Sequence, residues 1–206
     1  MNRHLFLEKY FADYIALCRR RNPYSNHDQM VTIPPCFDEV EALLMHFSKH
    51  GVKFVIGDTL AVIKHLHPYY RDMRAGIFRP ISKILLVISP KLPPIPESWE
   101  EVLDELGNLL WISPSRGYVQ FQEVNNIDSI SLDEESATVH CPVMDFKTVF
   151  VEKLKVKKHR DLLDLLSLAD SMGIPENLET ELLNEDQRKN LNRLKQWLKR
   201  RLAKEK

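Results

Sequence analysis

The amino-terminal third of the chain is patterned for helices, with one short strand between them. In residues 3–20, apolar side chains recur at three- and four-residue steps, which predicts an amphipathic helix. The same spacing predicts a second helix over 37–50, with Gly51 as its C-terminal cap. "VKFVIG" then has the composition of a strand, and "DTLAVIKHL" returns to helical spacing. We therefore expect residues 37–67 to form a helix, a strand, a tight glycine turn and a helix.

The middle of the chain is patterned mainly for strands. "SKILLVIS" is apolar on both faces, which is typical of a strand inside a sheet. "SWEEVLDELGN" follows, and its Ser98 N-cap, Glu101 three residues later and closing Gly107 predict a helix. "LLWIS" and "GYVQFQEV" flank a turn at 114–117 and predict a hairpin. "IDSISL" and "ATVHCPVM" are further strand candidates, separated by the acidic turn "DEES".

From residue 146 onward the apolar spacing is helical again. One helix is expected to end at Gly173, and the last begins after Asn184, which forms a capping box with Gln187. The chain is therefore expected to have an α/β (α+β) fold, a mixed sheet flanked by helices with additional helices at both ends. We expect three parts, which are an N-terminal helix and linker at 1–30, the α/β core at 31–145 and a helical region at 146–206.

Composition and charge add few constraints. Hydrophobic residues make up 44% of the 206, which is enough for a core. The 29 Lys and Arg balance the 29 Asp and Glu, so a surface that is basic all over is excluded while local patches are not. The three cysteines have no ligand-like spacing and predict reduced thiols in a cytoplasmic protein. No apolar run reaches the roughly 18 residues of a membrane span, so no membrane partner is expected.

Two stretches resemble a known family. "HGVKFVIGDTLAVIKHL" followed by "FRPISKILLVIS" resembles the minimal core of the nucleotidyltransferase superfamily, in which a glycine turn precedes an Arg and an Asp-x-Asp strand. "MDFKTVFVEKLKVKKHRDLLDLLSLA" is similar to the C-terminal helical signature of the branch that contains the toxins of type IV toxin–antitoxin systems. The resemblance implies a nucleotidyltransferase-like fold over residues 37–170. The motif positions are occupied by Gly57, Asp58, Thr59, Arg79, Lys83 and Leu85 in the core, and by Lys153, Arg160, Asp161 and Asp164 in the helical signature.

The metal-binding carboxylates of that superfamily are missing from their expected positions. The resemblance implies two magnesium ions held by carboxylates at alternate positions of one strand. Alignment places Lys83 and Leu85 there, and a shift of one residue supplies no carboxylate either. A lysine at that position repels a divalent cation. Asp128 is expected at the third carboxylate position, and Asp72 is the other acidic residue near the motif.

The residue after the turn glycine has two interpretations. Asp58 is expected to cap the helix that starts at Thr59, by accepting its free backbone N–H groups where a phosphate would otherwise bind. The alternative is that Asp58 is a relocated metal ligand. In the first case an ion pair between Asp58 and Lys83 would close the vestigial site.

The helical signature and the histidines also allow a structural interpretation. Arg160 and Asp164 are four residues apart, as are Lys157 and Asp161, so these pairs can stabilise the helix itself. A residual contact with a ligand is the alternative. His46 and His50 have the spacing of a zinc pair but no third ligand in a recognisable motif, and we expect them, with His65 and His67, to be surface residues.

The predicted function is that of a nucleotidyltransferase-fold protein that is catalytically degenerate and acts as a nucleic-acid- or protein-binding regulatory module, without a metal cofactor. The basic ends at 19–21 and 199–206 are candidates for phosphate contact, and the amphipathic helices there also fit a homo-oligomer. One alternative is an active, toxin-like nucleotidyltransferase with magnesium held by Asp58, Asp72 or Asp128. The other is a purely structural interaction protein, because a fold alone does not fix a function.

Overall fold

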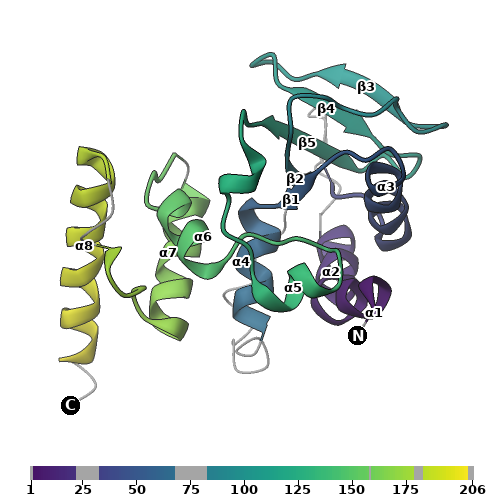
Figure 1. Cartoon of the computed structure of the whole chain (residues 1–206). Helices are drawn as coiled ribbons and strands as arrows, with labels where there is room; N and C mark the ends of the chain where they lie inside the picture. The colour runs from purple at the N-terminus through teal and green to yellow at the C-terminus, as the bar shows by residue number, and fades with distance from the viewer. Residues whose placement is uncertain (1, 22–32, 68–82, 158, 179–182, 204–206) are drawn as a thin grey trace.

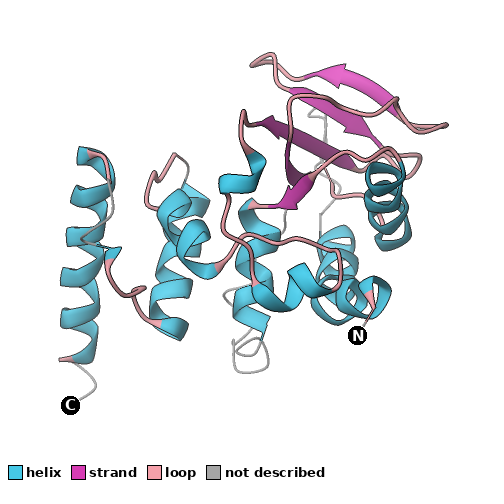
Figure 2. Ribbon diagram, in the orientation of Figure 1, coloured by secondary structure: helices cyan, strands magenta, loops and turns pink. Residues whose placement is uncertain are grey.

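The computed structural model describes residues 2–21, 33–67, 83–157, 159–178 and 183–203. A five-stranded mixed sheet lies at one end of the molecule, and helices lie beside and below it (Figure 2). The expected α/β class, a mixed sheet flanked by helices with further helices at both ends, is confirmed. Among the helices that the structure describes, none combines the length and the apolar character that a membrane crossing needs.

The sheet has the strand order β1-β2-β5-β4-β3. β2 and β5 are parallel, whereas the β1–β2, β4–β5 and β3–β4 pairs are antiparallel. The strand predicted from "SKILLVIS" lies inside the sheet, and the predicted hairpin is formed by β4 and β5. The strands are β1 (Phe54–Ile56), β2 (Lys83–Ile88), β3 (Glu100–Leu103), β4 (Leu109–Ile112) and β5 (Tyr118–Glu123).

The helices follow the apolar spacing of the sequence closely. The amino-terminal segment is helical throughout, with one π-helical turn, and the helices predicted around the glycine turn and after residue 146 are confirmed. The capping box of Asn184 and Gln187 is also confirmed. The helices are α1 (Arg3–Leu7), the π-helical η1 (Glu8–Ala12), α2 (Asp13–Arg21), α3 (Phe37–Lys49), α4 (Asp58–Leu66), the 3-10 helix η3 (Ile127–Ser129), α5 (Glu134–Thr138), α6 (Phe146–Lys153), α7 (His159–Met172) and α8 (Glu185–Leu202).

The alternation of side chains along β5 separates an apolar face of the sheet from a polar one. Phe121 is buried, and its ring stacks on Phe47 of α3 with 5.9 Å between the ring centroids. Gln120 and Gln122 point to the opposite face, because successive strand residues alternate. Gln120 lies opposite Leu85 of β2 in the parallel register. α3 therefore covers the apolar face, while the polar face is left for a site.

α4 is the central helix of the molecule. All its residues from 59 to 66 are buried, and it contacts β2, α6, α7 and η1 (Figure 1). Lys64 of α4 forms a buried ion pair with Asp133 and lies 3.8 Å from Glu135. The hydroxyl of Tyr10 donates to Glu135 at 2.5 Å. The amino-terminal helix is thus joined to the core by a charged network as well as by apolar packing.

The helix predicted for "SWEEVLDELGN" is wrong, because this segment forms the edge strand β3 and a turn. The indole N–H of Trp111 on β4 donates to the side-chain carboxylate of Glu101 on β3 at 3.1 Å. Asp104 accepts the backbone N–H of Asn108 at 2.8 Å, and Gly107 has a φ of 77° within that turn. Pairing with β4 therefore outweighs the local helical spacing, as tertiary contacts commonly do.

The strands predicted for "IDSISL" and "ATVHCPVM" are also wrong. The two segments contain η3 and α5, and only the isolated bridges of Val143 with Ile56 and of Leu132 with Met144 resemble strand pairing. The acidic turn between them begins a helix, because the Asp133 side chain accepts the backbone N–H of the third residue of α5.

Residues 33–36 pack tightly against the start of β5. Arg19 of α2 donates to the carbonyl of Pro34 at 2.7 Å and to that of Ser115 at 3.2 Å, so this arginine has a structural role. A Cβ atom added at Gly117 would lie 2.1–2.6 Å from backbone atoms of Pro34 and Pro35. No side chain fits there without movement of the backbone.

We expect Gly117→Ala to lower the free energy of unfolding by about 2–3 kcal/mol, the upper range for overpacking. Gly107→Ala is the matched control, because its Cβ would meet nothing within 4 Å and only its φ of 77° is strained. That control should cost about 1–2 kcal/mol. Urea unfolding of both variants tests the packing, and an equal or smaller loss for Gly117→Ala would contradict it.

Candidate functional site

A cavity of about 500 Å³ lies on the polar face of the sheet, between β2 and β5 on one side and α6 and α7 on the other. Its volume is within the usual range for a small-molecule site. Cationic side chains line it from the α6–α7 segment, and amide side chains line it from the sheet. The lining includes Asp58, Leu85, Asn108, Gln120, Gln122, Met144, Lys153, Lys155, Lys157, Arg160 and Asp161.

Asp58 enters this cavity from the glycine turn, and its backbone position differs from the predicted one. Gly57 is the N-cap residue of α4, and Asp58 is the first residue of the helix with a φ of 50°. The predicted capping position of Asp58 before a helix that starts at Thr59 is therefore wrong. The Asp58 carboxylate instead turns toward α6 and α7, where it pairs with Lys153 and Arg160.

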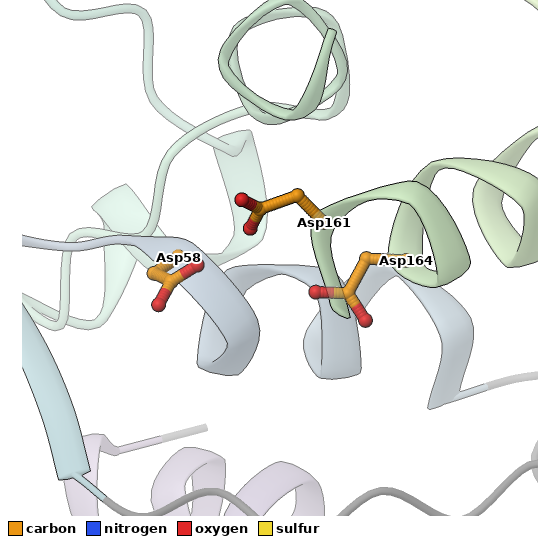
Figure 3. Close-up of side chains that lie close together, drawn as sticks. All are labelled: Asp58, Asp161 and Asp164. Atoms are coloured by element: carbon orange, nitrogen blue, oxygen red, sulfur yellow. The ribbon is translucent and has the colours of Figure 1, made fainter. Parts of the chain in front are cut away.

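Lys153, the last residue of α6, brings three carboxylates together. Its side chain is only 4% exposed. Its Nζ atom pairs with Asp58, lies 2.9 Å from Asp164 Oδ2 and lies 3.1 Å from Asp161 Oδ1. Figure 3 shows the three carboxylates converging, Asp58 from the start of α4 and the other two from α7. The helical signature therefore joins α4, α6 and α7 through one ammonium group.

The charges of this cluster stabilise one another. Burial by itself raises the pKa of Asp58, but the charge and hydrogen bond of Lys153 and the charge of Arg160 outweigh it and hold the pKa below its usual range. Burial likewise lowers the pKa of Lys153, and the Asp58 and Asp164 carboxylates reverse that effect and raise it. Lys153 and Asp58 are therefore both charged at neutral pH.

The same carboxylates have the spacing of metal ligands. Oxygen atoms of Asp58, Asp161 and Asp164 lie within 4.8 Å of one another, which is close enough to contact one cation. The Lys153 ammonium already contacts all three. A divalent ion bound there would have to displace a buried lysine, so the donor set fits an ammonium group better than a metal.

The two positions of β2 that the sequence resemblance aligned with metal-binding carboxylates are occupied by Lys83 and Leu85. Lys83 and Leu85 are the half-buried residues of β2 on one face, and Lys83 Nζ lies 4.0 Å from an Asp104 oxygen. Lys83 therefore pairs with Asp104, while Asp58 pairs with Lys153. The predicted ion pair between Lys83 and Asp58 is wrong. Across the parallel strand pair, the polar residues beside Leu85 are Gln120 and Gln122, whose amides line the cavity.

One of the predicted acidic candidates does not join the cluster. Asp128 lies in η3 and pairs with Lys53 at 2.6 Å, lining a different cavity, so its predicted place as a third carboxylate of the site is wrong. Asp72 and Arg79 lie outside the described residues.

The histidines form no metal site among the residues that the structure describes. His46 Nε2 donates to the Pro94 carbonyl at 2.7 Å, and His50 Nδ1 donates to the His46 carbonyl at 2.9 Å. His65 was expected at the surface, but it is buried within α4, with its Nε2 atom 2.9 Å from the carbonyl oxygen of Met144. Burial lowers the pKa of His65, which favours a neutral, structural residue.

Sequence reasoning missed the roles of Lys153, Gln120 and Gln122. Lys153 was placed in the helical signature, but its spacing along the chain does not reveal that it contacts Asp58, 95 residues away. The glutamines were visible as alternate polar residues in "YVQFQE", and the period of two places them on one strand face.

Comparison with known proteins gives one remote structural likeness. The crystal structure of an antigenic nucleotidyltransferase-like protein from Paracoccidioides brasiliensis is similar over 77% of this chain and 86% of that chain, at 12% identity and a TM-score of 0.49. A likeness at this level assigns neither a family nor a ligand. No protein-family model and no curated protein sequence matches the chain.

We expect Lys153→Met to lower the free energy of unfolding at pH 7 by about 3–5 kcal/mol, because it leaves buried carboxylates without their counter-ion. Lys155→Met is the matched control, since Lys155 is exposed and pairs with Glu152 on the surface, where a pair contributes at most about 1 kcal/mol. Urea unfolding measures both. A loss below about 1 kcal/mol for Lys153→Met would show that the ammonium does not hold the cluster together.

The defect of Lys153→Met should shrink as the pH falls from 7 to 4. In the wild type the lowered pKa of Asp58 adds stability above the unfolded pKa of about 3.9, and this stability is lost as the pH falls through the folded pKa. In the variant, the burial that raises the pKa of Asp58 is no longer opposed by Lys153, so protonation of Asp58 becomes easier in the folded state and the variant gains stability on acidification. Unfolding at pH 7, 5.5 and 4 tests this, and a gap from wild type that stays constant would contradict it.

Proposed function

We propose that this chain is a nucleotidyltransferase-like binding module that takes a nucleotide in the cavity without a divalent metal and does not transfer it. The observation that carries the proposal is the Lys153 ammonium among the carboxylates of Asp58, Asp161 and Asp164. Nucleotidyl transfer by the family mechanism needs metal ions that bridge the phosphate and the attacking group. Here the Lys153 ammonium occupies the centre of the one group of three carboxylates with metal-ligand spacing that is found among the described residues.

The two walls of the cavity suit two parts of a nucleotide. Lys157 supplies a cation from the α6–α7 segment, and such a group forms the stronger, charge-assisted hydrogen bonds to phosphate. Lys155 and Arg160 line the same wall, where they also pair with Glu152 and Asp58. Gln120 and Gln122 supply amides on the opposite wall, and an amide both donates and accepts, as the edge of a base requires. We infer a phosphate on the cationic wall and a base on the amide wall.

The order of elements supports the family part of the proposal. Helix, strand, glycine turn, helix and strand follow one another from α3 to β2, as the resemblance predicts. The helical signature lies against that turn, because Lys153 and Arg160 pair with Asp58. These are contacts of this chain itself, and they bring together the two motifs that carry the resemblance.

An active transferase is the second candidate, and one observation favours it. Asp58, Asp161 and Asp164 have the oxygen spacing of a cation site, and Asp58 begins the helix beside the cavity. In that case Lys153 would leave the cluster when metal and nucleotide bind. The toxin-like activity implied by the resemblance would then require magnesium. A purely structural protein is the third candidate, and it would bind no nucleotide at all.

Calorimetric titration with ATP, CTP, GTP and UTP, in EDTA and then in magnesium, separates the three candidates. We expect at least one nucleotide to bind in EDTA and Lys157→Gln to weaken it about 10- to 100-fold, the equivalent of a charged hydrogen bond. Lys49→Gln, an exposed lysine on α3, is the control and should leave binding unchanged. Binding that requires magnesium, or nucleotide consumption, would favour the transferase, and no binding would favour the structural protein.

A further inference from the structure

We propose that the solvent-facing side of α8 binds the phosphate backbone of a nucleic acid, at a surface separate from the cavity. α8 carries seven cationic residues and two acidic ones, and both acidic residues lie in its first turn. The chain as a whole has no net charge, so this helix concentrates a positive excess that the rest of the molecule balances. We call five of its exposed cations the cationic face, which consists of Arg188, Lys189, Arg193, Lys199 and Arg200. Arg201 is also exposed but pairs with Asp170.

The other side of α8 is fully used in packing. Leu191 and Leu194 are buried in the main core. Gln187 donates to the carbonyl of Val151 at 3.0 Å, and Asn190 donates to that of Leu154 at 2.9 Å, both near the end of α6. These contacts fix the rotation of the helix about its own axis. The cationic face is therefore held outward, along one end of the molecule (Figure 1).

The charge pattern differs from that of an ordinary solvated helix. Such helices usually alternate acids and bases four residues apart, because those pairs stabilise the helix. Lys189 and Arg193 have that spacing with like charges, which costs helix stability. Arg188 lies in the first turn, where the helix dipole disfavours a cation. Helix stability explains the cations of the last turn, Lys199, Arg200 and Arg201, because the helix dipole favours them there. It does not explain Arg188 or the like-charged spacing of Lys189 and Arg193, whereas attraction to a polyanion does.

The geometry of the face suits a chain of phosphates. From Arg188 to Arg200 the cations extend over about 18 Å of a straight, anchored helix, at 1.5 Å per residue. At one edge Trp197 is 36% exposed, with the Arg201 guanidinium 5.6 Å from its ring centroid. An exposed aromatic ring beside cations also offers a surface on which an unpaired base can stack.

A nucleic acid fits this face better than an anionic membrane. An amphipathic helix binds a bilayer by burying its apolar side among the lipids. The apolar side of α8 is already packed in the core, so the outside offers cations and the single ring of Trp197 but no apolar face that could insert among lipids. Nucleic acids bind largely through phosphate charge, with a strong dependence on salt.

The test is fluorescence anisotropy of the full chain with a labelled 20-base-pair DNA duplex and a 20-nucleotide RNA, from 50 to 200 mM KCl. We expect binding to at least one of them through about four phosphates, which makes the affinity fall about 150-fold over this range. The triple variant Lys189→Gln, Arg193→Gln, Arg200→Gln should bind at least tenfold more weakly at 50 mM and show a much weaker salt dependence. A control variant, Lys49→Gln, Lys91→Gln, Arg116→Gln, removes the same charge from other exposed positions and should bind like the wild type.

Three results would overturn the proposal: no binding at 50 mM KCl, equal weakening in the triple and control variants, or binding to phosphatidylserine vesicles without binding to either nucleic acid. Should the triple variant unfold, the single changes Lys189→Gln and Arg200→Gln keep the test decisive. Each should lower the slope of log affinity against log salt by about 0.9 for every phosphate that the variant no longer neutralises. None of these residues lines the cavity, so the outcome is independent of the nucleotide titration.

Discussion

The buried ammonium of Lys153 is the interaction on which the rest of this structure depends. It contacts carboxylates from the start of α4 and from α7, while its own backbone ends α6. Two charges removed from water are tolerated in a protein only when they are paired in good geometry. The packing of the carboxy-terminal helices against the glycine turn is therefore inseparable from the charge state of a single side chain.

That ammonium also limits what the cavity can do. Because Lys153 occupies the centre of the acidic cluster, the cations left for a ligand are those of the α6–α7 segment at the cavity wall, and we expect the anionic part of a ligand to bind there. The side-chain amides of Gln120 and Gln122 on β5 then orient the ligand through directional hydrogen bonds and add no charge. Recognition of this kind requires no metal to assemble the site.

The sequence predicts local structure well where the spacing of apolar residues and the caps agree, as in α3 and α8. It fails where a distant partner decides the outcome. "SWEEVLDELGN" has every local sign of a helix, yet its backbone pairs with β4, a contact that the residues of the segment itself do not reveal.

The prediction of the site is limited in the same way by contacts between distant residues. Asp58, Lys153, Asp161 and Asp164 were all identified from motifs, but the ion pairs that join them link positions up to about a hundred residues apart, which spacing along the chain does not show. The strand period places the glutamines of β5 on one face, but it does not reveal that this face lines a cavity.

The most direct test of the central claim is diffraction from wild-type crystals soaked in manganese chloride, with anomalous differences recorded at the manganese edge. We predict no anomalous peak among Asp58, Asp161 and Asp164, and continuous density for the Lys153 side chain ending among their oxygens. A manganese peak within bonding distance of two or more of these carboxylates, with Lys153 turned away, would contradict the account and restore the metal-dependent transferase.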